Sequence, residues 1–222
     1  MTIPMSAHPD VSQIERVRAL MEGRACVVVG SAPLKTPTAE ITQGEFVIAV
    51  NGGISSLPGA ADLWVLNSKL QDKRGENVKP LHKSMISQGK GRTAGHLLLL
   101  RGPKIASEQY TLETLDKLGT RYLTWSVLDK PTKLEFEKSI CERTERRPCS
   151  AGIFSTALAL HCGASSVRLV GVSFTPGYHY LPKAEPQSWW RDHVEADQRA
   201  LRALSARFGG RLSGAILQKV AA

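Results

Sequence analysis

Short apolar runs, separated by longer segments, constrain the fold of this chain more than any other feature of its sequence. Each run is apolar almost without interruption, whereas a strand with one wet face alternates apolar and polar residues. Such runs are typical of strands that are covered on both faces in a parallel sheet. The predicted strands span 25–29, 45–51, 61–67, 95–102, 121–126 and 166–174.

Segments with helical periodicity lie around these strands. The periodicity predicts helices over 11–22, 150–164 and 188–210, and Ser150 is a suitable N-cap for the second of them. Strands that alternate with helices predict a doubly wound, Rossmann-like, mostly parallel α/β sheet.

The length of 222 residues predicts a single α/β domain over 1–222. Two stretches inside it, 68–94 and 127–149, lack clear periodicity. We interpret both as loops or a lid inserted into the domain, rather than as parts of its core.

Charge and composition narrow the classes of ligand. The net charge of +9 favours anionic partners such as nucleotides, acidic glycans or phosphorylated lipids. Basic residues are spread along the chain and are not interleaved with aromatic ones, so we do not expect nucleic-acid binding. The four cysteines form no CxxC pair, which predicts buried thiols and no zinc site. Because the chain shows neither a signal-peptide pattern nor a run of about 20 apolar residues, we expect a cytoplasmic protein.

Small and amide residues follow several predicted strands at the point where each strand ends. Gly30 and Ser31 follow the first strand, Asn51 the second and Asn67 the third. Each residue type is also a common turn former. In an open α/β sheet, however, ligands bind beyond the carboxyl ends of the strands, so these residues are expected to share one edge. Their coincidence there predicts a nucleotide site.

The motifs of two large nucleotide-binding classes are missing from this edge. The stretch "VVVGSAPLK" has neither the GxGxxG fingerprint of dinucleotide-binding folds nor the GxxxxGK[ST] pattern of P-loop proteins. The chain also has no DxD pair placed to hold a metal-bound diphosphate. These observations argue against an NAD enzyme and against a P-loop ATPase.

Four segments, in order along the chain, resemble the sialyltransferase-like glycosyltransferases, especially the bacterial enzymes that use CMP-sialic acid. They are "VVVGSAPLK", the pair "FVIAVNGG" and "ADLWVLNS", the run "RPCSAGIFSTALALHCGASSVRLVGVSF", and "YHYLP" with "WWRDHVEADQRALRAL". Together they cover about half of the chain. The resemblance implies a variant of the GT-A glycosyltransferase fold, and a single nucleotide-sugar-binding domain over 1–222.

The resemblance also implies roles for individual residues. The positions implied to contact the nucleotide or the donor sugar are Gly30, Ser31, Pro33, Asn51, Gly52, Asn67, Ser68, Ser150, Ala151, Gly152 and Ser173. Tyr178 and Tyr180 would hydrogen-bond the departing phosphate, and His193 would be the general base. His179, between the two tyrosines, competes with His193 for that role.

The implied activity is an inverting, metal-independent transfer of an acidic sugar from a CMP donor to a glycan or glycolipid. A phosphate monoester leaving group needs hydrogen-bond donors more than a metal ion, and a histidine suits removal of the acceptor proton. Ser31 and Ser173 stand where the family commonly has Asn and Asp, so the donor sugar is left open between sialic acid and a Kdo-like sugar. No cofactor is implied beyond the CMP-sugar co-substrate. The positive charge adds the expectation of peripheral contact with the anionic inner membrane face.

Two other functions stay open at this level. A pterin pyrophosphokinase-like enzyme shares the G-S-x-P turn and the S-x-G helix start, and it would require ATP and Mg²⁺. A non-catalytic nucleotide-binding protein would bind CMP without turnover.

Overall fold

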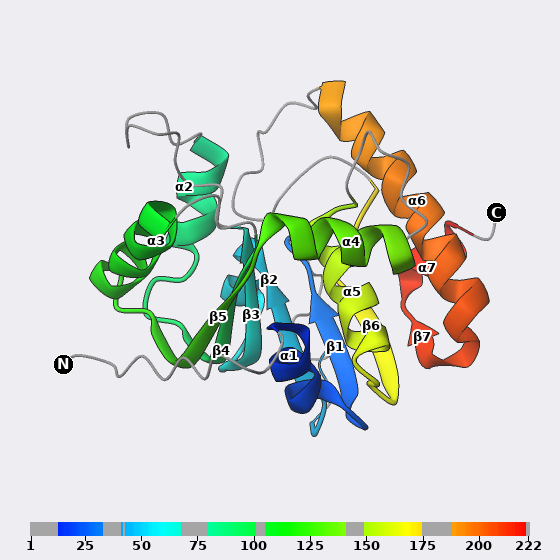
Figure 1. Cartoon of the computed structure of the whole chain (residues 1–222), viewed down its shortest axis with the longest axis horizontal. Coiled ribbons are helices and arrows are strands. Elements are labelled where there is room, and N and C mark those ends of the chain that lie inside the picture. Colours follow the sequence, from blue (N-terminus) through cyan, green and yellow to red (C-terminus); the bar gives the residue numbers. More distant parts are fainter. Residues whose placement is uncertain are drawn as a thin grey trace.

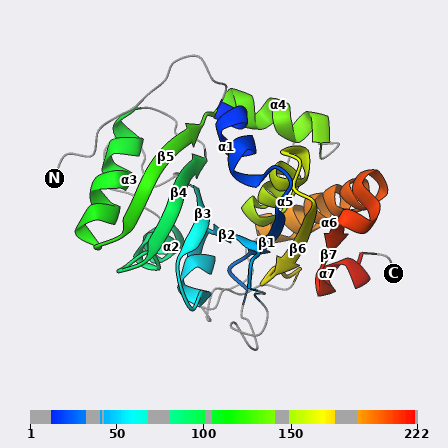
Figure 2. The ribbon, with the colours of Figure 1, turned by 90° about the horizontal axis from the view of Figure 1, so that it is seen from below.

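The computed structural model describes residues 13–32, 41, 43–67, 80–100, 105–140, 149–174 and 188–220. All neighbouring strands of its seven-stranded sheet pair in parallel, in the order β5-β4-β3-β2-β1-β6-β7 (Figure 2). The strands are β1 (Ala25–Val29), β2 (Phe46–Val50), β3 (Ala61–Asn67), β4 (Thr93–Leu100), β5 (Arg121–Leu128), β6 (Ser166–Val170) and β7 (Leu212–Ser213). The predicted doubly wound parallel sheet is therefore confirmed.

Helices cover both faces of this sheet (Figure 1). The helices are α1 (Gln13–Met21), α2 (Pro80–Ser87), α3 (Ile105–Lys117), α4 (Lys130–Ile140), α5 (Ala151–His161), α6 (Ser188–Phe208) and α7 (Ala215–Gln218), with 3₁₀ helices η1 (Asn51–Ser56) and η2 (Gly209–Arg211). One face of the sheet forms a hydrophobic core with side chains of α1, α4, α5, α6 and α7. The other face forms a second core with side chains of η1, α2 and α3.

Successive side chains of the central strands point alternately into the two hydrophobic cores, one on each face of the sheet. Cys26 and Val28 of β1 point into the core under α5, while Val27 and Val29 point into the core under α2 and α3. Successive side chains of a strand face opposite sides, so a strand buried on both faces must be apolar at every position. This explains the uninterrupted runs in the sequence.

The interpretation of 127–149 as an irregular loop is wrong for its first half. Residues Lys130–Ile140 form α4, which packs on α5 and α6. Phe136 is buried against Phe154 of α5, with ring centroids 5.4 Å apart. In the other stretch, 68–94, the described residues form α2 and the beginning of β4, and Met85 and Ile86 of α2 are buried in the core. In α4, the buried charged residues Lys133 and Glu137 interrupt the apolar periodicity that would have indicated a helix.

The predicted burial of the cysteine thiols is confirmed for Cys26, Cys149 and Cys162, which are free and buried. Burial raises the pKa of Cys26 to about 11 and that of Cys162 to about 12. Both thiols therefore stay protonated at neutral pH. Cys141 lies outside the described residues.

A buried histidine gives the fold a dependence on pH. His96 of β4 lies between Thr124 and Ser126 of β5, whose hydroxyl oxygens are 2.6 and 2.8 Å from its ring nitrogens. Burial, with a smaller contribution from Arg16 of α1, lowers the pKa of His96 to about 4. The folded chain therefore holds this imidazole in its neutral form.

We expect His96 to destabilise the fold as the pH falls from 6.5 to 4. Over this range the unfolded chain binds the proton and the folded chain does not, so the free energy of unfolding falls by about 3 kcal/mol at full effect. Urea denaturation of the wild type and of His96→Gln across this range measures the difference. Equal pH dependence in the two proteins would contradict the assignment.

Candidate active site

The turn after β1 lies at the point where the order of the sheet reverses. β1 pairs with β2 on one side and with β6 on the other, which is where open α/β sheets bind ligands. A Cβ atom on Gly30 would lie 2.3 Å from the carbonyl oxygen of Gly171, and one on Gly53 would lie 2.3 Å from that of Val29. The backbones of three turns thus touch, and glycine is required for that close approach.

Hydrogen bonds hold the ends of β1, β2 and β3 in register at this edge. Ser31 Oγ donates to the carbonyl of Val50 at 3.2 Å, and the Asn67 N–H donates to Asn51 Oδ1 at 2.9 Å. The indole N–H of the buried Trp64 donates to the backbone carbonyl of Asn51 at 2.8 Å. The polar residues that follow these strands therefore also build the edge itself.

Asn51 has a left-handed backbone, with φ of 50°, alone among the described non-glycine residues. We expect Asn51→Ala to lower the free energy of unfolding by about 2–3 kcal/mol, because it strains the backbone and removes the Oδ1 that accepts the Asn67 N–H. Asn51→Gly loses only the hydrogen bond and should cost about 1 kcal/mol. Urea denaturation of both variants checks this order, and an equal loss in both would show that the backbone is not strained.

The first turn of α5 faces the same edge. Val172, just after β6, has a methyl group 3.5 Å from the Cβ position of Gly152 and 3.0 Å from that of Gly30. Ser150 is the N-cap of α5, and its Oγ accepts from the Ile153 N–H at 3.4 Å. The N–H groups of Ala151 and Gly152 have no partner within the helix, and both residues are only half-buried. This helix start can therefore donate to an anion.

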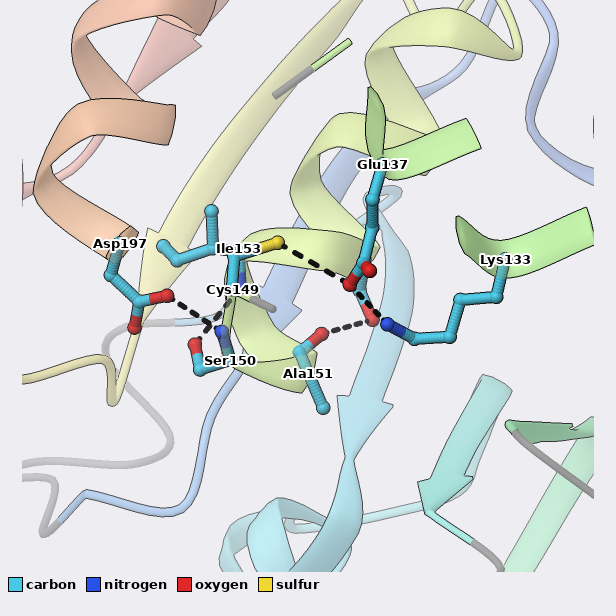
Figure 3. A network of polar contacts seen from close by, with 8 residues as sticks. Lys133, Glu137, Cys149, Ser150, Ala151, Ile153 and Asp197 are labelled. Carbon is cyan, nitrogen blue, oxygen red and sulfur yellow. Dashed lines mark hydrogen bonds and ion pairs between the residues drawn. The ribbon is translucent and has the colours of Figure 1, made fainter. Parts of the chain in front are cut away.

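A buried carboxylate from α6 contacts the same helix start (Figure 3). Asp197 Oδ1 accepts the Ser150 N–H at 2.6 Å. Burial raises the pKa of Asp197 to about 6, hydrogen bonding from Ser150 opposes that shift, and the charge of Glu137 adds to it. Ser150 is thus held on one side by α6 and on the other by its own helix.

A buried ion pair from α4 lies on the other side of this helix start (Figure 3). Lys133 pairs with Glu137, and both side chains are almost completely buried. Glu137 also accepts a hydrogen bond from the Cys149 thiol at 3.7 Å, and the Lys133 ammonium lies 4.5 Å from the ring centroid of Phe154. Two helices therefore fix Cys149 and Ser150 from opposite sides.

The structure brings together most of the predicted binding residues that it describes. Those at or next to the shared edge are Gly30, Ser31, Asn51, Gly52, Asn67, Ser150, Ala151, Gly152 and Ser173. Ser173 follows β6, and Gly52 in η1 accepts a hydrogen bond from Ser55. Their roles toward a ligand stay predictions.

Six other predicted positions are described only in part or not at all. Pro33, Ser68, Tyr178, Tyr180 and the competing His179 lie outside the described residues. Residue 193 falls in the first turns of α6, where the structure describes the backbone alone.

Sequence reasoning assigned no role to Asp197, Glu137 or Lys133. A signal for the first was present: Asp197 follows His193 by four residues, the spacing that puts two residues on one face of a helix. Glu137 and Lys133 lie in the stretch that we interpreted as a loop, so their i, i+4 relation was not considered. Within the described part of the chain, no group of three or more His, Cys, Asp or Glu side chains is placed to hold a metal ion.

The chain resembles solved sialyltransferases in its fold. The sialyltransferase CstII from Campylobacter jejuni, in complex with the substrate analogue CMP-3FNeuAc, matches with a TM-score of 0.50 and 12% identity, over 86% of this chain and 80% of that one. The sialyltransferase CST-II in complex with trisaccharide acceptor and CMP matches with a TM-score of 0.50 and 11% identity, over the same shares. No family model matches the chain, and a search of curated proteins finds no significant relative. The chain therefore has a sialyltransferase-like α/β fold.

Proposed function

We propose that this protein is a glycosyltransferase that moves an acidic sugar from a CMP donor to a glycan or glycolipid. The observation that carries the proposal is the junction of the β1 turn, the β6 turn and the α5 start around Val172. This junction lies at the switch point of a sialyltransferase-like fold. Solved structures of that fold hold CMP-3FNeuAc, or CMP with a trisaccharide acceptor, which supports CMP as the nucleotide here.

The phosphate of CMP would bind at the start of α5. The N–H groups of Ala151 and Gly152 and the positive end of the helix dipole favour an anion there. Gly30 and Asn51 would lie beside the cytidine. Because the site offers donors that the phosphate can use as it departs, we propose that transfer needs no metal ion.

The reaction would be a single displacement with inversion at the anomeric carbon. The acceptor oxygen forms the new glycosidic bond, the bond from the sugar to the CMP oxygen breaks, and CMP leaves with its electron pair. His193 would take the acceptor proton, while Tyr178 and Tyr180 would hydrogen-bond the departing phosphate. A sialic acid or Kdo-like donor fits the excess of basic residues in the chain.

The same positive charge supports an acceptor on an anionic membrane surface. Among the described residues, no helix combines the length and the apolar character needed to cross a membrane. Peripheral contact would therefore be electrostatic and sensitive to salt. Sedimentation with anionic vesicles at low and high salt tests this contact. If the same fraction of the protein sediments with neutral vesicles as with anionic ones, electrostatic membrane contact is rejected.

A thermal-shift panel of CMP, CDP, UDP, ATP and NAD, each with and without Mg²⁺, tests the proposed function. A ligand that binds only the folded chain stabilises it by about 2.7 kcal/mol at a concentration 100 times its Kd. We expect CMP to raise Tm, without Mg²⁺, and ATP and NAD to leave it unchanged. A shift with ATP and Mg²⁺ alone would favour a pyrophosphokinase-like enzyme, and no shift with CMP would reject the proposal.

A further inference from the structure

The helix that carries His193 is joined to the proposed nucleotide site by one buried carboxylate. Asp197 of α6 is only 7% exposed, and it accepts the N–H of Ser150 at the start of α5 at 2.6 Å. α6 also contacts α4 and β7, so it is anchored on several sides. Asp197 is the point where α6 meets the N-cap of α5.

The hydrogen bond from the Ser150 N–H to Asp197 fixes the backbone of the N-cap residue. The Ser150 hydroxyl oxygen accepts the Ile153 N–H of its own helix at 3.4 Å. The carboxylate uses the N–H of Ser150, so the N–H groups of Ala151 and Gly152 stay available to a ligand. Asp197 therefore orders the helix start without occupying its first-turn donors.

Helical spacing places residue 193 close to this contact. It precedes Asp197 by four residues within α6, and residues four apart lie on the same face of a helix, one turn from each other. A contact that fixes Asp197 against α5 thus also fixes the backbone at residue 193 relative to the start of α5.

Burying a carboxylate here costs stability. Its raised pKa of about 6 reflects burial first and then the charge of Glu137 on α4, which is itself paired with Lys133. A well-packed apolar pair in the place of a buried charged group is often neutral or stabilising. An apolar contact would therefore hold the two helices together at a lower cost in stability. The carboxylate adds a directional hydrogen bond that orients the N-cap of α5.

We propose that Asp197 is a positioning residue, which sets the start of α5 and the His193 segment of α6 at a fixed separation. The inference rests on the proposed function, because it assigns the two ends of this contact to phosphate binding and to proton removal. Asp197 itself touches neither substrate. It acts through Ser150 on one side and through the α6 backbone on the other.

Three variants separate positioning from general stability. Asp197→Ala removes the contact, and Asp197→Asn keeps an oxygen that can accept the Ser150 N–H. Leu204→Val is the matched control, because Leu204 is a fully buried core residue of the same helix. The measurements are CMP affinity by titration calorimetry, kcat and KM for transfer, Tm, and hydrogen exchange of the amides from 149 to 153.

We expect Asp197→Ala to lose exchange protection at the start of α5, to bind CMP about tenfold more weakly and to lower kcat by about tenfold to a hundredfold. Asp197→Asn should restore most of the protection and of the activity. Leu204→Val should lower Tm without these changes. An Asp197→Ala protein that folds and keeps wild-type CMP affinity and kcat overturns the proposal, as does an Asp197→Asn protein that recovers neither property.

The exchange measurement keeps the two proposals distinguishable. If the wild type binds no CMP, the proposed function fails. Loss of protection in Asp197→Ala would then show a purely structural contact, which overturns the positioning role. If the wild type binds CMP and exchange at 149–153 is the same in all variants, the proposed function stands and the positioning role is overturned.

Discussion

Replacing His193 by alanine should lower transfer by about a hundredfold or more and leave CMP affinity unchanged. A general base contributes in this range, because it removes the acceptor proton in the transition state and takes no part in holding the nucleotide. Steady-state kinetics with a CMP-sugar donor, together with CMP titration, measure the two effects separately. The acidic limb of the pH profile of kcat should also disappear in the variant.

His179→Ala is the matched control for this substitution, because His179 is the competing candidate for the base. We expect it to retain the acidic limb of the profile. If His193→Ala keeps wild-type turnover while His179→Ala loses it, the base is His179. If neither variant loses turnover, the chemistry does not use a histidine base.

Replacing Gly53 by alanine should lower the free energy of unfolding by about 3 kcal/mol or more. The new methyl group would lie 2.3 Å from the Val29 carbonyl oxygen and 2.7 Å from that of Gly30. Both atoms belong to backbone at the end of β1, so no side chain can rotate to relieve the clash, and η1 must separate from the strand. Chemical denaturation measures the loss, and CMP affinity should fall with it because Gly30 moves.

Gly59→Ala provides the control for that experiment. A Cβ atom on Gly59 meets nothing within 4 Å, and its φ lies outside the left-handed region. The substitution should be neutral or stabilise the chain by up to about 1 kcal/mol, because alanine restricts the unfolded state. Similar losses in the two variants would show that the turn after β1 is not closely packed.

The central strands could be predicted because burial on both faces requires an apolar residue at nearly every position. β1, with four consecutive apolar residues after Ala25, admits few other interpretations. β7 could not be predicted, since two residues carry no periodicity, and its pairing depends on β6 beside it. α4 was missed because only part of one face is apolar, and because its buried Lys133 and Glu137 are typical of a surface.

The edge of the site could be predicted from the ends of strands, but its internal contacts could not. Parallel topology alone brings Gly30, Asn51 and Asn67 together. The bond from Ser150 to Asp197 joins residues 47 positions apart, and it depends on how α6 packs against α5. Periodicity within a short segment of sequence does not predict how two distant helices pack.

Hydrogen exchange with and without CMP tests most directly whether this edge is a nucleotide site. The account predicts that CMP slows exchange in three segments at once: the turn at 30–32, the start of η1 at 51–53 and the start of α5 at 149–153. Peptides from β5, far from the switch point of the sheet, should be unchanged. Protection confined to other segments, or no protection at a CMP concentration that would saturate a micromolar site, would contradict the account.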